Sequence, residues 1–389
     1  MSLTQPFGNC EKNNVAHIKT ITPSKSDFYS DNGTLCFNKK RNVLVPYQFS
    51  EPFKATLSGI AFDYIARFLV AEKAKQYRDL ALTGLVAEHI YLYSSSKWFH
   101  HEDAKNQGHN QYKSYLRRLS DLIDNDALMN SDEAIRICVV LAKMERESRA
   151  GKEIAPTFEI TVDDEDVVQD VISLAQVFSA SFLPRVTSDS VIVFNPTFGI
   201  GSRVVGGADA DLFIDGTLYD FKVKKENSWS GVLARQLVGY YIIDSIAKDA
   251  EDSVNKLSSH PIERVALYNA RFAETDYYDV DRLDPVQLEL TKSAIRHEYL
   301  MRRLRNYGYD ILLKLGIPLT EEELRFCSDD LEIEVEIWER IDKEKSDRII
   351  NAWNKLNVFL SCTDTNTLLR NIVALNNAKL TLHRNRMNA

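Results

Sequence analysis

The sequence predicts an α/β protein in which a mixed β-sheet is flanked by helices, with further helices at both ends of the chain. Between residues 191 and 272, short stretches of alternating polar and apolar residues, typical of strands, surround a segment with apolar residues at helical spacing. Before and after this part, apolar residues recur every three or four positions, as in amphipathic helices. The chain has 389 residues, 44% of them hydrophobic, which suffices for two or three domains with sizeable cores.

Breaks in these patterns divide the chain. Its first part is polar, rich in Asn, Ser and Lys and without periodicity, so we expect it to be extended or partly strand-like and to pack across the body. Helical spacing is interrupted by a stretch with Gly151 and Pro156, and it resumes after Asp284-Pro285. The predicted regions are an extended leader (1–55), a helical region (56–150), an α/β core (151–285) and a helical C-terminal region (286–389). Within the core we expect a helix at about 164–182, three strands, a second helix and a last strand ending near Phe272.

The core contains a stretch that reads as a β-hairpin. Polar and apolar residues alternate from Asp209 to Ile214, and the alternation resumes after Asp215-Gly216. Asp-Gly suits a two-residue type I′ turn, because both turn residues need a positive φ and glycine adopts it without steric cost. The sequence therefore predicts a tight hairpin centred on this dipeptide.

That turn also predicts which residues face each other. With Asp215 and Gly216 as the loop, Asp211 lies opposite Asp220, and Asp209 lies opposite Lys222. Directly opposed residues of an antiparallel pair have Cβ atoms roughly 4.5–5.5 Å apart, so two like charges there destabilise the hairpin. A divalent cation between the carboxylates would offset the repulsion, and oxygen ligands with free water positions suit Mg²⁺ or Mn²⁺.

The simpler alternative is a solvated hairpin face. Acidic side chains on one face of a hairpin are commonly exposed, and Asp209 with Lys222 could form a cross-strand ion pair that contributes little. The next segment favours the functional interpretation. Gln236 and Tyr240 are four residues apart in an apolar stretch with helical spacing, so they share one helix face.

Taken in order, these motifs resemble the PD-(D/E)XK nuclease superfamily, in its RecB-like branch. The resemblance covers roughly a quarter of the chain and rests on spacing and order. Its elements are Gly-x-x-Asp from Gly206 to Asp209 (or Asp211), Asp220-Phe221-Lys222 on the next strand, and Gln236 to Tyr240 on the following helix.

The resemblance implies a restriction-endonuclease-like fold and a metal-dependent deoxyribonuclease. Asp220 and the carbonyl of Phe221 would bind Mg²⁺ or Mn²⁺ with a carboxylate of the preceding strand. The family motif selects Asp209 for that carboxylate, whereas the hairpin register selects Asp211; we favour Asp211 and keep Asp209 as the alternative. Lys222 would assist the attacking water or the developing negative charge, and Gln236 and Tyr240 would position the site.

A further metal ligand on an upstream helix is expected from the same resemblance. Glu88 and His89, in a segment with helical spacing, are the candidates, and Asp170, nearer to the sheet, competes with them. A lone Glu-His pair on a helix is more commonly exposed, so the assignment stays open.

The overall charge restricts how nucleic acid could bind. With 48 basic and 56 acidic side chains the net charge is −8, which argues against a simple DNA-coating protein but allows a nuclease with a local basic patch. Lys224 and Lys225, with Arg203 and Arg235 nearby in sequence, are the candidates for that patch. Solubilising charges at a strand end would explain the two lysines equally well.

The remaining features bound the setting. Five scattered cysteines without Cys-x-x-Cys spacing argue against zinc, disulfides and an iron–sulfur cluster. No signal peptide, membrane span or Walker-type loop is recognised, so a cytoplasmic location is expected, without a membrane partner and without nucleotide hydrolysis. Expected partners are DNA, a helicase or other companion protein, and further copies of the chain, in phage defence or DNA repair and processing. A nuclease-fold protein that binds without cutting, and an interaction protein with an incidental hairpin, are the rival interpretations.

Overall fold

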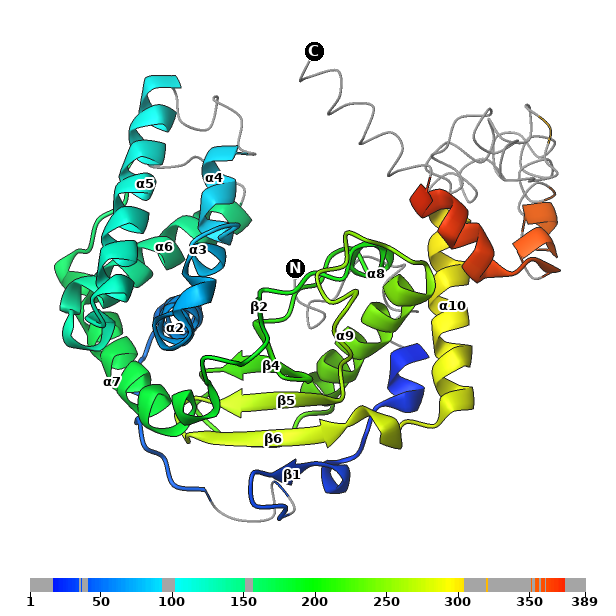
Figure 1. Ribbon diagram of the computed structural model, residues 1–389, viewed down its shortest axis with the longest axis horizontal. Coiled ribbons are helices and arrows are strands. Elements are labelled where there is room, and N and C mark those ends of the chain that lie inside the picture. The colour runs from blue at the N-terminus through cyan, green and yellow to red at the C-terminus, as the bar shows by residue number, and fades with distance from the viewer. Residues whose placement is uncertain are drawn as a thin grey trace.

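The protein is built on a six-stranded mixed sheet with helices on both faces (Figure 1). The computed structural model describes residues 17–34, 36, 41–92, 102–150, 157–303, 320, 351, 354–356, 358–360 and 362–374. The strand order is β1-β6-β5-β4-β3-β2. The strands are β1 (Tyr29–Ser30), β2 (Ile192–Phe194), β3 (Leu212–Ile214), β4 (Thr217–Lys222), β5 (Arg264–Asn269) and β6 (Glu274–Asp279). The predicted α/β class with a mixed sheet and flanking helices is confirmed.

One pair of strands in this sheet is parallel. Strands β4 and β5 run in the same direction, and the other neighbouring pairs are antiparallel. Parallel neighbours need a long crossover connection, which here contains helix α9 (Gly231–Asp249). The crossover therefore lays α9 against the face of the sheet beside β4.

The predicted hairpin register is confirmed. Ile214 pairs with Thr217 and Leu212 with Tyr219, as a two-residue Asp215-Gly216 turn requires. Both turn residues have positive φ, 45° at Asp215 and 82° at Gly216, as a type I′ turn demands. The local turn chemistry thus determines which side chains of β3 and β4 face each other.

One face of the sheet is covered by helices from the first half of the chain (Figure 1). Helix α2 (Pro52–Lys73) packs against α6 (Asp132–Ala150) and α7 (Glu165–Ser181). Aromatic rings join this layer to the sheet: Phe178 of α7 and Phe182, directly after α7, lie 5.6 Å and 5.4 Å from Phe221 of β4, measured between ring centroids. Three further helices extend the layer: α3 (Arg78–Ala81), α4 (His89–Leu92) and α5 (Glu102–Asp124). The region predicted as helical at 56–150 therefore shares one core with the sheet.

The opposite face carries α9, α8 (Ile200–Val204) and α10 (Pro285–Arg303). Apolar residues of α9 such as Leu237 and Ile243 form a second core with Phe213, Leu218 and Val265 of the sheet. The sheet is thus buried on both faces, and its polar residues are confined to the ends of its strands and to a few hydrogen-bonded positions.

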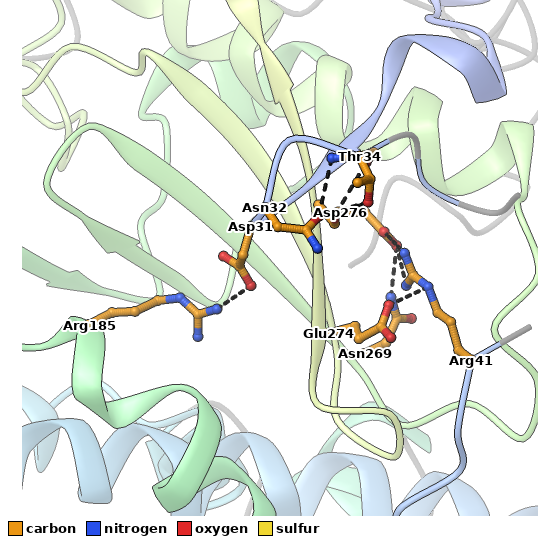
Figure 2. Close-up of polar contacts among 9 residues, drawn as sticks. Asp31, Asn32, Thr34, Arg41, Arg185, Asn269, Glu274 and Asp276 are labelled. Carbon is orange, nitrogen blue, oxygen red and sulfur yellow. Dashed lines mark hydrogen bonds and ion pairs between the residues drawn. The ribbon is translucent and has the colours of Figure 1, made fainter. Parts of the chain in front are cut away.

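The leader is partly a strand, as predicted, because Tyr29–Ser30 adds the edge strand β1 to the sheet. The helix at residues 17–21 and strand β6 were not predicted. The polar sequence of β6 did not predict a strand, but its buried Asp276 accepts hydrogen bonds from Arg41 and Asn269 (Figure 2). The partner of this carboxylate, Arg41, is distant in sequence, so the local pattern of residues could not predict the strand.

Helix α7 belongs to a segment, Val162–Arg185, that is long and apolar enough to cross a membrane by length and composition, with a mean hydropathy of 1.3. Its apolar residues, including Val171 and Phe178, are buried in the core beside α2 and the sheet. We therefore interpret it as a core helix.

Asp170 of α7 forms a buried ion pair. Its two oxygens accept hydrogen bonds from Nη1 and Nη2 of Arg271, each at 2.7 Å, and the Ser58 hydroxyl of α2 donates to it at 2.5 Å. Arg271 is fully buried, and its guanidinium lies 5.3 Å from the ring centre of Tyr47. The pair ties α7, α2 and the β5–β6 connection together, which leaves Asp170 no part in a metal site.

We expect Asp170→Ala to destabilise the fold by about 3–5 kcal/mol, because it leaves the Arg271 charge buried without its partner. Asp166→Ala, one turn earlier, breaks the exposed ion pair with Lys54 and should cost about 1 kcal/mol or less. Urea denaturation of both variants measures the difference, and equal losses would contradict a structural role for the buried pair.

Candidate metal centre

The two opposed carboxylates of the hairpin meet at the end of β3 and β4. The main-chain N–H of Asp211 donates to the Tyr219 carbonyl at 3.3 Å, and Asp211 Oδ2 accepts from the N–H of Phe221 at 2.5 Å. The regular β3–β4 ladder ends at Leu212, and the bond from Asp211 to Tyr219 departs from its register by one residue. The bond from Phe221 nevertheless holds the Asp211 carboxylate beside β4, close enough to Asp220 for the two charges to interact. Lys222, two residues further along β4 and on the same face, forms an ion pair with Asp220 Oδ2.

Helix α9 holds the other oxygen of Asp220. Gln236 Nε2 donates to Asp220 Oδ1 at 3.0 Å and to the Tyr240 hydroxyl at 2.6 Å, and that hydroxyl lies 3.4 Å from the same Oδ1. All three side chains are buried. The orientation of Asp220 is thus fixed, with Oδ1 toward α9 and Oδ2 toward Lys222.

A small polar pocket of about 60 Å³ adjoins Asp211. Asp209 and Asp211 line one side of it, and Asp63 of α2 and Glu145 of α6 line the other. Asp63 was missed in the sequence, where it stands within an apolar helical stretch. An isolated carboxylate amid buried residues was the available signal, but only the packing of α2 shows that it faces the hairpin.

The carboxylates of this site repel one another. Burial, followed by the charge of Asp220, raises the pKa of Asp211 to about 7, and burial with the charge of Asp211 raises the pKa of Asp63 well above its usual value. Both side chains touch solvent only partly. Burial opposes the charge on Lys222, but Asp220 and Asp211 outweigh it and raise its pKa. Without a cation, the raised pKa values favour the protonated forms of Asp211 and Asp63 and the charged form of Lys222.

These residues suit a hard divalent cation. Mg²⁺ is commonly held by one or two carboxylates together with waters and phosphate oxygens, which matches Asp211 and Asp220, with the Phe221 carbonyl and Asp63 as further oxygen donors. Within the described part of the chain, no three His, Cys, Asp or Glu residues are arranged as a metal-binding group. A metal here would thus depend on water and substrate for its remaining ligands.

Asp209 does not lie where the hairpin register placed it. The β3–β4 ladder ends at Leu212, and Asp209 instead forms an antiparallel bridge with Thr197, after a turn in which Gly206 and Gly207 both have positive φ. Lys222 forms an ion pair with Asp220. Asp209 lines the pocket beside Asp211.

Glu88 and His89 are not brought to this centre. The expected continuous helix is interrupted at residues 82–85, after which Glu88 ends a short 3-10 helix and His89 begins α4. Glu88 Oε1 lies 3.7 Å from His109 Nε2 of α5, and neither Glu88 nor His89 lines the pocket. The carboxylate that α2 supplies is Asp63.

The predicted basic residues are scattered around the site. Burial, and to a smaller extent the nearby charge of Lys222, lowers the pKa of Lys224. The Lys225 ammonium lies 5.8 Å from the ring centre of Tyr47. Arg203 is exposed on α8, Arg235 is half-buried on α9, and none of the four lines the pocket.

Comparison with protein-family models, curated proteins and solved structures finds no match to this chain. The resemblance to the PD-(D/E)XK superfamily therefore stays a prediction, and the functional argument rests on the geometry of the site.

The raised pKa values predict that pH and metal act together on stability. An acidic group whose pKa is higher in the folded than in the unfolded protein stabilises the fold at low pH. This stabilisation is lost as the pH rises from the unfolded-state pKa, about 4, through the folded-state pKa. For Asp211 the folded value is about 7, so the metal-free protein should lose on the order of 1–3 kcal/mol between pH 5 and 8 from this group.

Thermal unfolding with a chelator, then with added Mn²⁺, tests this expectation. Mn²⁺ should raise the melting temperature strongly at pH 8 and little at pH 5, because protons and metal compete for the carboxylates. Asp211→Asn, which can still accept the Phe221 hydrogen bond, should flatten the pH dependence and remove most of the Mn²⁺ effect. A Mn²⁺ effect that is the same at both pH values would contradict the assignment.

Proposed function

We propose that this protein is a Mg²⁺- or Mn²⁺-dependent nuclease that hydrolyses DNA phosphodiester bonds. The observation that carries the proposal is the proximity of the Asp211 and Asp220 carboxylates at the end of two strands, with Lys222 beside them and Gln236 and Tyr240 holding Asp220. Opposed buried carboxylates cost stability, and a binding or scaffold protein has no use for them.

Each side chain has a definite part in the proposed reaction. Asp211 and Asp220 would hold the metal, which would supply an activated water and offset charge on the scissile phosphate. Lys222, on the same face of β4, would stabilise the attacking water or the phosphoryl oxygens with its ammonium. Gln236 and Tyr240 keep Asp220 oriented, and Asp63 offers a further oxygen from the opposite wall.

The arrangement of the sheet supports a restriction-endonuclease-like fold as part of the same proposal. An antiparallel hairpin carries the carboxylates, the helix after it crosses over to a parallel neighbour, and that helix supplies the Gln/Tyr pair. Phage defence or DNA repair and processing, a cytoplasmic location and a helicase or other companion protein extend the proposal beyond the site.

The second candidate is a nuclease-fold protein that binds without cutting. The Lys222–Asp220 ion pair favours it, because the pair neutralises one carboxylate without any metal. The two candidates make opposite predictions for metal-dependent cleavage.

Purified protein with Mn²⁺ should cut DNA, and a chelator should stop the cutting. Asp220→Asn and Lys222→Ala should each lower the rate by about 10²–10³-fold or more, because each removes a group acting on developing charge. Lys75→Ala and Asp79→Asn alter exposed charges outside the pocket and serve as controls with the wild-type rate. No cleavage by any metal-loaded preparation, or unchanged cleavage by Asp220→Asn, would refute the proposed nuclease.

A further inference from the structure

A buried arginine lines the pocket without an acidic partner. Arg67 of α2 is 7% exposed, and within the described residues its guanidinium bonds only to uncharged acceptors. These are Oδ1 of Asn195 and the carbonyls of Leu80 and Thr83, the latter two at 2.9 Å and 2.8 Å. Its buried Nε has no hydrogen-bond partner among those residues. A buried cation without an acidic partner is costly, so an anionic ligand would stabilise this arrangement.

Arg67 stands one helical turn after Asp63. Residues four apart on a helix are neighbours, with Cβ atoms roughly 5–6 Å apart, and both side chains line the same pocket. Helix α2 therefore presents a carboxylate to the metal centre and a guanidinium directly beside it.

Two further cations adjoin Arg67. Arg149 of α6 lines the pocket with 46% of its side chain exposed, while pairing with Glu145 at 2.7 Å. The exposed Lys256 donates from Nζ to the carbonyl of Asn195 at 3.1 Å. The cationic groups thus come from α2, from α6 and from the segment after α9.

Asn195 connects two of these cations to Asp211. Its side chain accepts from Arg67, its carbonyl accepts from Lys256, and its N–H donates to the Asp211 carbonyl at 3.1 Å. Its φ of 41° is a left-handed conformation that asparagine tolerates better than most residues. Through Asn195, Arg67 and Lys256 are therefore held in fixed positions relative to Asp211, although both are far from it in sequence.

The pocket and its surroundings hold cations as well as carboxylates. The carboxylates are Asp63, Glu145, Asp209, Asp211 and Asp220, and the cations are Arg67, Arg149, Lys222 and Lys256. Arg67 and Arg149 therefore offer positive charge to an anion on their side of the pocket.

We propose that Arg67, Arg149 and Lys256 form a subsite for the backbone phosphate next to the scissile one. This inference rests on the proposed nuclease function and names where its substrate is held. Arginine matches phosphate oxygens through its planar donors, and lysine adds a point charge. The predicted patch of Lys224, Lys225, Arg203 and Arg235 lies outside the pocket, so it does not provide this contact.

Binding of a labelled single-stranded DNA oligonucleotide to the full chain, measured by fluorescence anisotropy with a chelator present, tests the subsite without cleavage. Arg149→Gln and Lys256→Gln alter exposed side chains, so we expect both variants to fold. Each should weaken binding and reduce the slope of log affinity against log salt by about 0.7, the value for one lost phosphate contact on a single strand. Lys75→Gln should keep the wild-type slope.

Replacing one phosphate by an uncharged methylphosphonate locates the contact. A methylphosphonate next to the cleavage position should weaken DNA binding by the wild-type protein. In Lys256→Gln the same replacement should cause no further loss of affinity, because the phosphate contact is already lost. Wild-type salt slopes in both Arg149→Gln and Lys256→Gln would overturn the subsite, because these cations would then serve only internal ion pairs. Asp220→Asn separates the two proposals: unchanged cutting by this variant refutes the nuclease, whereas the anisotropy slopes judge the subsite independently.

Discussion

The two-residue turn at Asp215-Gly216 is the constraint on which the site depends. Positive φ at both residues permits a two-residue loop, and that loop fixes the β3–β4 register, beyond which the Asp211 carboxylate is held beside Asp220 by the Phe221 N–H. A shift of one residue would send each side chain to the other face of the sheet. Because helix α9 follows β4 and packs on the sheet beside it, Gln236 and Tyr240 contact Asp220.

The hairpin was predictable from sequence because its information is local. The turn dipeptide, the alternation and the spacing of Gln236 and Tyr240 can all be recognised without knowing what packs where. Asp63 and Arg67 were not predictable in the same way, since their relation to Asp211 arises from the packing of α2 against the end of the sheet. Strand β6 was missed for a similar reason, because its buried Asp276 is satisfied by Arg41 from the leader.

The two walls of the pocket have different origins and different parts in the proposed chemistry. The strand wall supplies Asp211, with Asp220 next to it on β4, and a metal would relieve the repulsion between these two carboxylates. The helical wall supplies Asp63 and, one turn on, Arg67, whose charge has no acidic partner among the described residues. Asn195 joins the walls by bonding to Arg67 and to the Asp211 backbone. A cation on one side and a phosphate on the other would complete the charges of both walls.

The most direct test of this account is a calorimetric titration of the metal-free protein with Mn²⁺ near pH 7, in buffers of different ionisation enthalpy. We predict saturable binding with release of protons, because carboxyls with raised pKa values must ionise to take the metal. Asp211→Asn and Asp220→Asn should each remove most of the binding. Binding that releases no protons, or that survives both substitutions, would contradict the claim that the opposed carboxylates form a metal site.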